Sequence, residues 1–314
     1  MGSLAGFRIS DLVLRIWLRP SGRAKFSARS AVRNGGENRR SVVFVLARQG
    51  KGWYAGGHCY WQLIGSLASR NWMFVVSKIS DRLERMKETI ESACNRAGRD
   101  PSEVKLVVVT KSASLEGVKE IIRLGITELA ENRVQQLKKV SVQVTSFLQS
   151  GGESGLAKDV NWHMIGHLQR NKVRQVLPIA SLIHSVDTLR LAEEISISAA
   201  KLNLRSRVLL QVNTSNEPQK YGVPVGAATH LAEQIGTLPN LELAGLMTMA
   251  PLTHNKRAVR TSFTRARELF DEMRGERIVG PEFKELSMGM SSDYEIAIAE
   301  GGTILRIGSA IFAG

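Results

Sequence analysis

Apolar and polar residues alternate along most of the chain with two different periods, one typical of helices and one typical of buried strands. From Ser77 onward, apolar residues recur at spacings of three and four with charges opposite, which predicts an amphipathic helix that ends at Gly98. Its apolar face consists of Ile79, Leu83, Met86, Ile90, Ala93 and Ala97. Asp100 and Pro101 then mark a turn. The following run, 104–110, is too short and too β-branched for a helix, so it predicts a buried strand.

This alternation repeats until it has produced eight segments that we expect to be strands. They are 104–110, 126–130, 160–165, 182–186, 208–212, 243–247, 285–288 and 303–307. Helix-like stretches between them include 115–124, 189–202, 227–238 and 260–273, and the Gly- and Ser-rich segment 150–158 predicts a surface loop. Eight strand-helix units over about 200 to 250 residues predict one α/β domain, a closed (β/α)8 TIM barrel. An open Rossmann-like sheet is the alternative, but no GxGxxG follows the first strand.

Composition separates the first part of the chain from the rest. The 314 residues carry a net charge of +14, but residues 1–78 hold thirteen Lys and Arg against only Asp11 and Glu37. The remaining 236 residues carry 30 basic and 27 acidic side chains and are therefore nearly neutral. The first segment also holds four of the five tryptophans and has no sustained apolar period. We therefore expect residues 1–76 to form a basic N-terminal extension and residues 77–314 to form the barrel.

Three explanations of this extension remain open. It is translated from a start site chosen too early, with Met73 as the true initiator, or it is an organellar transit peptide, or it is a basic arm that binds nucleic acid. The third is disfavoured because aromatic residues interleaved on a sheet, or an RNP-like motif, are missing. We expect a cytoplasmic protein without a nucleic-acid partner, or an organellar one if residues 1–72 are a transit peptide.

Cysteine and hydropathy patterns exclude several classes of protein. Cys59 and Cys94 cannot form a disulfide framework and have no zinc spacing, which favours a reducing compartment. His163 and His167 lie four residues apart, but Met164 stands where an HExxH motif has glutamate, so we expect no metal. No apolar run of eighteen residues occurs, and no membrane span is predicted.

In a TIM barrel, function lies at the carboxyl ends of the strands. Lys111 follows the first strand, where low-dielectric walls favour the neutral amine that condenses with aldehydes. Gly- and Ser-rich loops, 287–292 and 308–309, follow strands seven and eight, where barrels often bind phosphate. Singly, these features are also consistent with a solvent-exposed lysine and ordinary turns. Together they predict a phosphate-bearing aldehyde held at both ends, with its phosphate anchored across the mouth from Lys111.

Eight short strings in the chain resemble, in order, the YggS/PROSC family of pyridoxal phosphate homeostasis proteins. They are VVTK (108–111), AENR (130–133), WHMIGHLQ (162–169), QVNT (211–214), KYG (220–222), GLMT (245–248), LSMGMS (286–291) and RIGSAIF (306–312). The likeness covers the chain from about Ser77, and the first 72 residues have no counterpart. It implies a single barrel of the alanine racemase N-terminal type, without the C-terminal β-domain of the racemases.

The resemblance also implies roles for particular residues. Lys111 matches the lysine that forms the internal aldimine with pyridoxal 5′-phosphate, and Asn132 and His163 match positions that line the cofactor ring. The phosphate cradle is matched by Ser287, Gly308 and Ser309, and Met290 of the LSMGMS string belongs to the same cofactor-binding set. Arg306 takes the place of the arginine that meets the pyridine nitrogen in related enzymes. A barrel-end salt bridge remains open for Arg306, and a hydrogen-bonded core histidine remains open for His163.

Two functions from different classes are consistent with this set. The first is a pyridoxal phosphate carrier in vitamin B6 homeostasis, which we expect to be a monomer without catalytic activity whose partners are the cofactor and apo forms of cofactor-dependent enzymes. The second is an amino-acid racemase or lyase on the same barrel. A two-base racemase needs a tyrosine from a further domain, and here only Tyr221 or Tyr294 is a candidate substitute. The sequence therefore favours the carrier.

Overall fold

The computed structural model describes residues 78–149, 159–215, 217 and 219–312, together with four strands within the first 44 residues. The predicted loop 150–158, Met73 and Cys59 lie outside the described residues. The chain divides into two compact units, Met1–Phe74 and Val75–Gly314.

The first unit contains a small antiparallel sheet that the sequence pattern did not predict. Its strands follow one another in space in the order of the sequence: β1 (Gly6–Ile9), β2 (Leu12–Leu18), β3 (Ala24–Ser30) and β4 (Val42–Phe44). The longest pairing joins β2 to β3, from Leu12 opposite Ser30 to Leu18 opposite Ala24. β2 is apolar except for Arg15 and so lacks the alternation of a half-buried strand, whereas β3 does alternate, with Lys25, Ser27 and Arg29 between Ala24, Phe26 and Ala28. The three explanations of the origin of this extension stay predictions.

The second unit is a closed barrel of eight parallel strands. These are β5 (Lys105–Val109), β6 (Glu128–Glu131), β7 (Asn161–Met164), β8 (Ala180–Val186), β9 (Ser206–Asn213), β11 (Leu241–Met247), β12 (Glu285–Ser287) and β13 (Ile304–Ile307). They run β9-β11-β12-β13-β5-β6-β7-β8, and β8 pairs with β9 to close the ring. All eight predicted strands and the predicted TIM-barrel fold are confirmed. A short β10 (Val223–Pro224) extends the sheet beside the end of β9.

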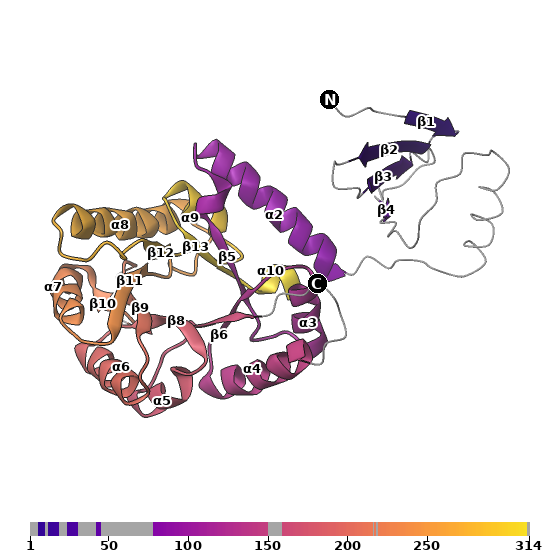
Figure 1. Ribbon diagram of the computed structural model, residues 1–314. Coiled ribbons are helices and arrows are strands. Elements are labelled where there is room, and N and C mark those ends of the chain that lie inside the picture. Colours follow the sequence, from indigo (N-terminus) through magenta and orange to yellow (C-terminus); the bar gives the residue numbers. More distant parts are fainter. Residues whose placement is uncertain are drawn as a thin grey trace. The chain divides into compact units, whose positions relative to one another are not determined.

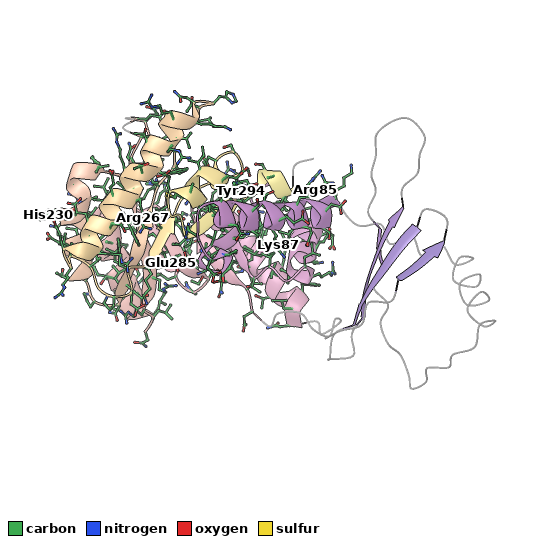
Figure 2. The ribbon with its side chains drawn as sticks, turned by 90° about the horizontal axis from the view of Figure 1, so that it is seen from above. Arg85, Lys87, His230, Arg267, Glu285 and Tyr294 are labelled. Carbon is green, nitrogen blue, oxygen red and sulfur yellow. The ribbon has the colours of Figure 1, made fainter. Side chains whose placement is uncertain are left out.

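Helices surround this barrel (Figure 1). They are α2 (Lys78–Arg96), α3 (Leu115–Arg123), α4 (Val134–Gln149), α5 (Val173–Val176), α6 (Leu189–Lys201), α7 (Val225–Gly236), α8 (Lys256–Gly275), α9 (Tyr294–Ala299) and α10 (Ser309–Phe312). Side-chain oxygens of Ser114, Thr188 and Asn255 accept backbone N–H bonds at the starts of α3, α6 and α8, which satisfies donors that a helix leaves unpaired. Polar side chains such as Arg85 and His230 lie at the periphery (Figure 2).

Alternate residues of the strands point into the barrel and fill it in layers. The apolar interior consists of Val107, Val109, Ala130, Leu182, Leu209, Ala244, Met247 and Ile304. At the amino end, Lys105 pairs with Glu285 at 3.5 Å and Arg207 pairs with Glu242 at 2.8 Å. The opposite face of each strand packs against the helices, as Leu106 and Val108 do on β5. The positions on β5 that point inward share their parity with Lys111, the second residue after the strand ends.

Candidate functional site

Lys111 lies at the carboxyl end of β5, where the strand gives way to a turn. The N–H of Ala113 donates to the carbonyl of Thr110 at 2.9 Å and closes this turn. Thr110 itself is buried, and its hydroxyl donates to Glu131 Oε1 at 2.5 Å. Lys111 is exposed to solvent. The ends of β5 and β6 are therefore fixed to each other, with the lysine at the mouth of the barrel. Its exposure to solvent differs from the partly desolvated environment that the sequence predicted.

Glu131 ends β6 next to the predicted site residue Asn132. Its side chain is fully buried, and Oε2 has no hydrogen-bond partner among the described residues. Burial raises the pKa of this carboxyl, while the bond from Thr110, the N–H of Asn132 and the charge of Lys111 act in the opposite direction. Glu131 shares its side of β6 with Leu129, which packs against the helices, whereas Ala130 faces the barrel interior, so the carboxyl lies on the outer face of the strand.

Asn132 follows Glu131, and the segment after β7 packs against the backbone of Asn132. A Cβ at Gly166 would overlap the backbone carbonyl of Asn132, so only glycine allows these two segments to approach. Asn132 is half-buried at the same end of the barrel as Lys111. This position is consistent with its predicted role beside the cofactor ring, which stays a prediction.

Arg306 is buried and rigidly held on β13. It donates from one terminal nitrogen to Ser287 Oγ at 2.6 Å and from the other to the carbonyl of Thr248 at 2.8 Å. Burial lowers the pKa of this guanidinium to about 10, and the charge of Asp293 opposes the shift. The group is therefore still cationic at neutral pH. In the described part of the chain no carboxylate forms an ion pair with Arg306, so the barrel-end salt bridge left open by the sequence is not found there.

The loops after β12 and β13 meet beside β5. Ser309 Oγ donates to Ser291 Oγ at 2.9 Å, and the N–H of Ala310 donates to the same oxygen at 3.2 Å. A Cβ at Gly308 would lie 2.6 Å from the carbonyl oxygen of Val109. Hydroxyls, backbone amides and a glycine that permits close approach form the kind of cradle that accepts phosphate.

This arrangement corrects one expectation. The sequence analysis placed the phosphate anchor across the mouth from Lys111, but β13 pairs directly with β5, and Ile307 lies opposite Val108. Neighbouring strands are about 4.8 Å apart, so the cradle and the lysine lie on the same side of the mouth. The expectation was wrong because a closed barrel places its last strand beside its first strand, so the loops that follow these two strands are neighbours.

His163 is buried on β7 and uses both ring nitrogens within the protein. Nδ1 lies 2.8 Å from His184 Nε2, and Nε2 lies 2.7 Å from Glu128 Oε2. Any contact that His163 makes with a cofactor ring would therefore use its carbon atoms. The sequence analysis did not identify His184 or Glu128 as residues near the site. His184 could have been noticed, because it is a histidine within the mostly apolar predicted strand 182–186.

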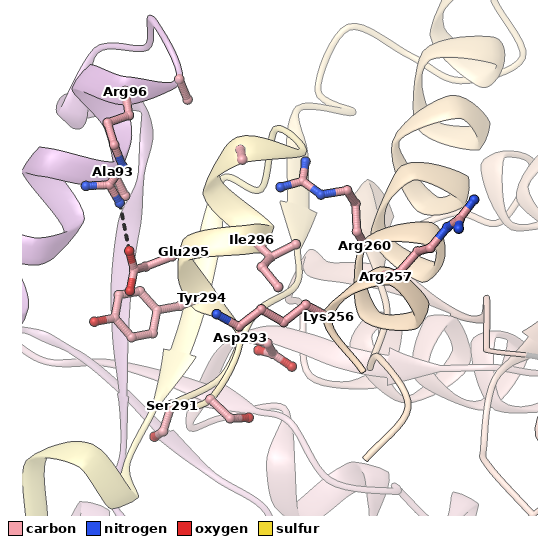
Figure 3. A pocket seen from close by; sticks show the side chains of 13 residues that line it. Ala93, Arg96, Lys256, Arg257, Arg260, Ser291, Asp293, Tyr294, Glu295 and Ile296 are labelled. Atoms are coloured by element: carbon pink, nitrogen blue, oxygen red, sulfur yellow. Dashed lines mark hydrogen bonds and ion pairs between the residues drawn. The ribbon is translucent and has the colours of Figure 1, made fainter. Parts of the chain in front are cut away.

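A pocket of about 740 Å³ adjoins the cradle on its outer side, between α2, α8 and α9 (Figure 3). Four cations line it: Arg96, Lys256, Arg257 and Arg260. Arg96 pairs with Glu295 at 2.7 Å, and Lys256 extends from α8 toward α9 in Figure 3. Ser291 borders both this pocket and the cradle. In the described part of the chain no group of three metal-ligating side chains occurs, and no helix there is long and apolar enough to cross a membrane.

Fold and site together define a class: a (β/α)8 barrel with a lysine after its first strand and an anion cradle on the last two. The family described as "Alanine racemase, N-terminal domain" matches residues 82–314. Pyridoxal phosphate homeostasis protein of Aquifex aeolicus is 40% identical over 232 residues, which cover 74% of this chain and 96% of that protein. The chain therefore belongs to the family of pyridoxal phosphate homeostasis proteins, as its eight strings predicted.

Solved structures agree with this assignment. The crystal structure of an unknown protein from Bifidobacterium adolescentis is 36% identical, with a TM-score of 0.70, and the match covers 75% of this chain and 94% of that one. PipY of Synechococcus elongatus, solved with PLP bound, is 30% identical with a TM-score of 0.61, and the match covers 75% of this chain and all of PipY.

Proposed function

We propose that the barrel binds pyridoxal 5′-phosphate through Lys111 and acts as a carrier in vitamin B6 homeostasis. The observation that carries this proposal is the cradle at Gly308 and Ser309, which lies against the end of β5, two residues before Lys111. PipY, a relative over most of the barrel, was solved with PLP bound. The close approach of the backbone at Gly308 fits a small ligand with a phosphate.

Each group in the site has a task in holding this ligand. When bound, the cofactor supplies an aldehyde that condenses with an amine. Lys111 supplies that amine, and Ser291, Ser309 and the amides after Gly308 hold the phosphate. Arg306, fixed by Ser287 and Thr248, presents a cation that does not release its proton at neutral pH. A ring nitrogen that meets it stays unprotonated, which makes the cofactor a weak electron sink and suits storage better than catalysis.

Neither of the two tyrosines that could act as a second base supports the racemase alternative. The hydroxyl of Tyr294 bonds Thr89 on α2, outside the barrel. Tyr221 stacks on His167 with ring centroids 4.3 Å apart and is 57% exposed. A general base needs a fixed position within hydrogen-bond reach of its substrate, and an exposed ring on a surface loop does not provide one. The curated relatives are named homeostasis proteins, not enzymes. We infer a non-catalytic monomer that exchanges the cofactor with apo forms of cofactor-dependent enzymes in the cytoplasm.

Covalent trapping tests the proposal directly. The purified chain is expected to be yellow, and borohydride reduction is expected to add the cofactor mass to a peptide that contains Lys111. Lys111→Ala should remove the colour and the label. Lys138→Ala, on α4 with its amine bonded to Gln175 at 3.3 Å, is the matched control and should keep both. Label on another lysine, with the Lys111 peptide unmodified, would reassign the site. Racemisation of alanine by the wild-type protein would favour the alternative function.

A further inference from the structure

A chain of hydrogen-bonded side chains crosses the interior of the barrel and ends at Arg306. His163 lies between Glu128 Oε2, at 2.7 Å, and His184 Nε2, at 2.8 Å. His184 Nδ1 lies 3.0 Å from Ser287 Oγ, which in turn accepts the bond of 2.6 Å from Arg306. The five residues come from five strands, and none of the interactions is local in sequence.

Of the five side chains in this hydrogen-bonded series, only that of Glu128 is partly exposed to water. The side chain of Glu128, at the start of β6, is 22% exposed, whereas His163, His184, Ser287 and Arg306 are all buried. Around Glu128, Asn161 on β7 donates to Oε1 at 2.7 Å, and Lys105 on β5 adds a positive charge. Burial acts to raise the pKa of Glu128, but the bonds from His163 and Asn161 and the charges of His163 and Lys105 outweigh it and lower the pKa. Glu128 is therefore ionised at neutral pH.

The directions of the four bonds follow from the ends of the chain when both histidine rings are neutral. A carboxylate only accepts, so His163 Nε2 carries a proton, and Nδ1 of the neutral His163 ring accepts from His184 Nε2. Nδ1 of the neutral His184 ring then accepts from Ser287 Oγ, and this oxygen accepts from Arg306 because a guanidinium only donates. In this protonation state all four bonds point from the cation toward the carboxylate.

The aligned hydrogen bonds act on the buried charge of Arg306. Arg306 is a buried cation. The buried carboxyl of Asp293 acts on it electrostatically, but the two form no ion pair among the described residues, and burying a charge without a paired partner is costly. His184 is kept neutral because burial lowers its pKa well below the ordinary value, and the charges of Arg306 and Lys105 act in the same direction. Aligned hydrogen bonds through neutral groups polarise one another, so the effect of a charge at one end is felt at the other.

We propose that Glu128 is the remote counter-ion of Arg306 and that, with His163, it acts as a positioning residue through His184 and Ser287. In this arrangement the chain holds the guanidinium cationic and fixed toward the ligand that the mouth of the barrel binds. The ligand class follows from the proposed function, on which this inference rests: a phosphorylated heteroaromatic aldehyde whose ring nitrogen is an acceptor. A ligand with a protonated ring nitrogen would be rejected, because two donors would then face each other.

The tautomers can be measured without any ligand. In the apo form of the full chain, nitrogen NMR of labelled histidines is expected to show His163 and His184 neutral and protonated on Nε2. A proton on Nδ1 of His184 would overturn the proposal, and no variant is needed for that result. If the wild-type protein failed to bind pyridoxal phosphate, the proposed function would be wrong, but the tautomer measurement would still test the direction of the hydrogen bonds.

Affinity and colour provide the second test. Glu128→Gln removes the charge and keeps the shape. It is expected to weaken pyridoxal phosphate binding by about tenfold, which corresponds to ~1.4 kcal/mol. It should also shift the pH midpoint of the visible band of the bound cofactor, which a purely structural role would not move. Glu242→Gln, at the same end of the barrel but paired with Arg207, is the control and should stay within about twofold of wild type. An unchanged affinity and an unchanged band in Glu128→Gln would refute the counter-ion role.

Discussion

Gly308, directly after the last strand of the barrel, lies against Val109 on the first strand, so closely that a Cβ at Gly308 would be 2.6 Å from the carbonyl oxygen of Val109 and 3.1 Å from its Cβ. Because Lys111 follows two residues later, this contact sets the distance between the amine and the cradle. The spacing of the two ends of the site is thus determined by backbone packing between β13 and β5.

Gly308→Ala tests this contact. The added methyl group cannot fit without a backbone shift, so we expect a loss of about 1–3 kcal/mol in the free energy of unfolding and at least tenfold weaker cofactor binding. Urea denaturation and a binding titration measure the two effects. Gly280→Ala is the matched control, since nothing lies within 4 Å of its Cβ position, and it should change neither. Normal cofactor binding by Gly308→Ala would mean that the cradle lies elsewhere.

Glu131 should make the barrel less stable as pH rises. Its pKa is raised in the folded state, chiefly by burial, so the folded protein binds a proton more tightly than the unfolded chain does. That stabilisation is complete below about pH 4.5, the ordinary pKa of the group, and is lost as pH rises through the folded-state pKa. In Glu131→Gln the decline in unfolding free energy across this range should be smaller, and the part that remains is expected from Asp187 and Asp293, whose pKa values burial also raises. Glu84→Gln, on the exposed face of α2, should retain it.

Arg306→Gln should lower both stability and cofactor retention. It removes the donors that satisfy Ser287 Oγ and the carbonyl of Thr248, and each buried acceptor left without a partner costs about 1–3 kcal/mol. We expect a loss of at least ~2 kcal/mol in urea denaturation. Arg274→Gln, an exposed position near the end of α8, serves as the control. Equal stability of the two variants would contradict the assigned hydrogen bonds.

Removal of the N-terminal extension should leave binding intact. The core residues of the barrel lie within the unit Val75–Gly314, so a chain that starts at Met73 retains every residue of the site. We expect its affinity for pyridoxal phosphate to match that of the full chain within about twofold. Mass spectrometry of the natural N-terminus then separates a late start at Met73 from cleavage elsewhere. A truncated chain that folds but fails to bind would make the extension part of the function.

The sequence predicted the barrel well because each strand-helix unit has its own local signal. The run 104–110 and the helix that starts near Ile79 are recognisable from neighbouring residues alone, and so is Lys111 at a strand end. Glu128 and His184 are different, because each lies on a strand that reads as apolar, and their partners are set by strand order and register. The sheet of the first unit was missed because the segment as a whole has no sustained apolar period, although the short strand β3 does alternate. Roles at the site stay predictions, since spacing along the chain carries little information on which inward-facing groups meet.

The pairing of β13 with β5 also has a consequence for synthesis on the ribosome. In the proposed site, Lys111 emerges early, but the amides after Gly308 are translated only after all strands of the barrel. A nascent chain would then have the amine and no anchor for a phosphate, so retention of the cofactor would require translation past the final strand.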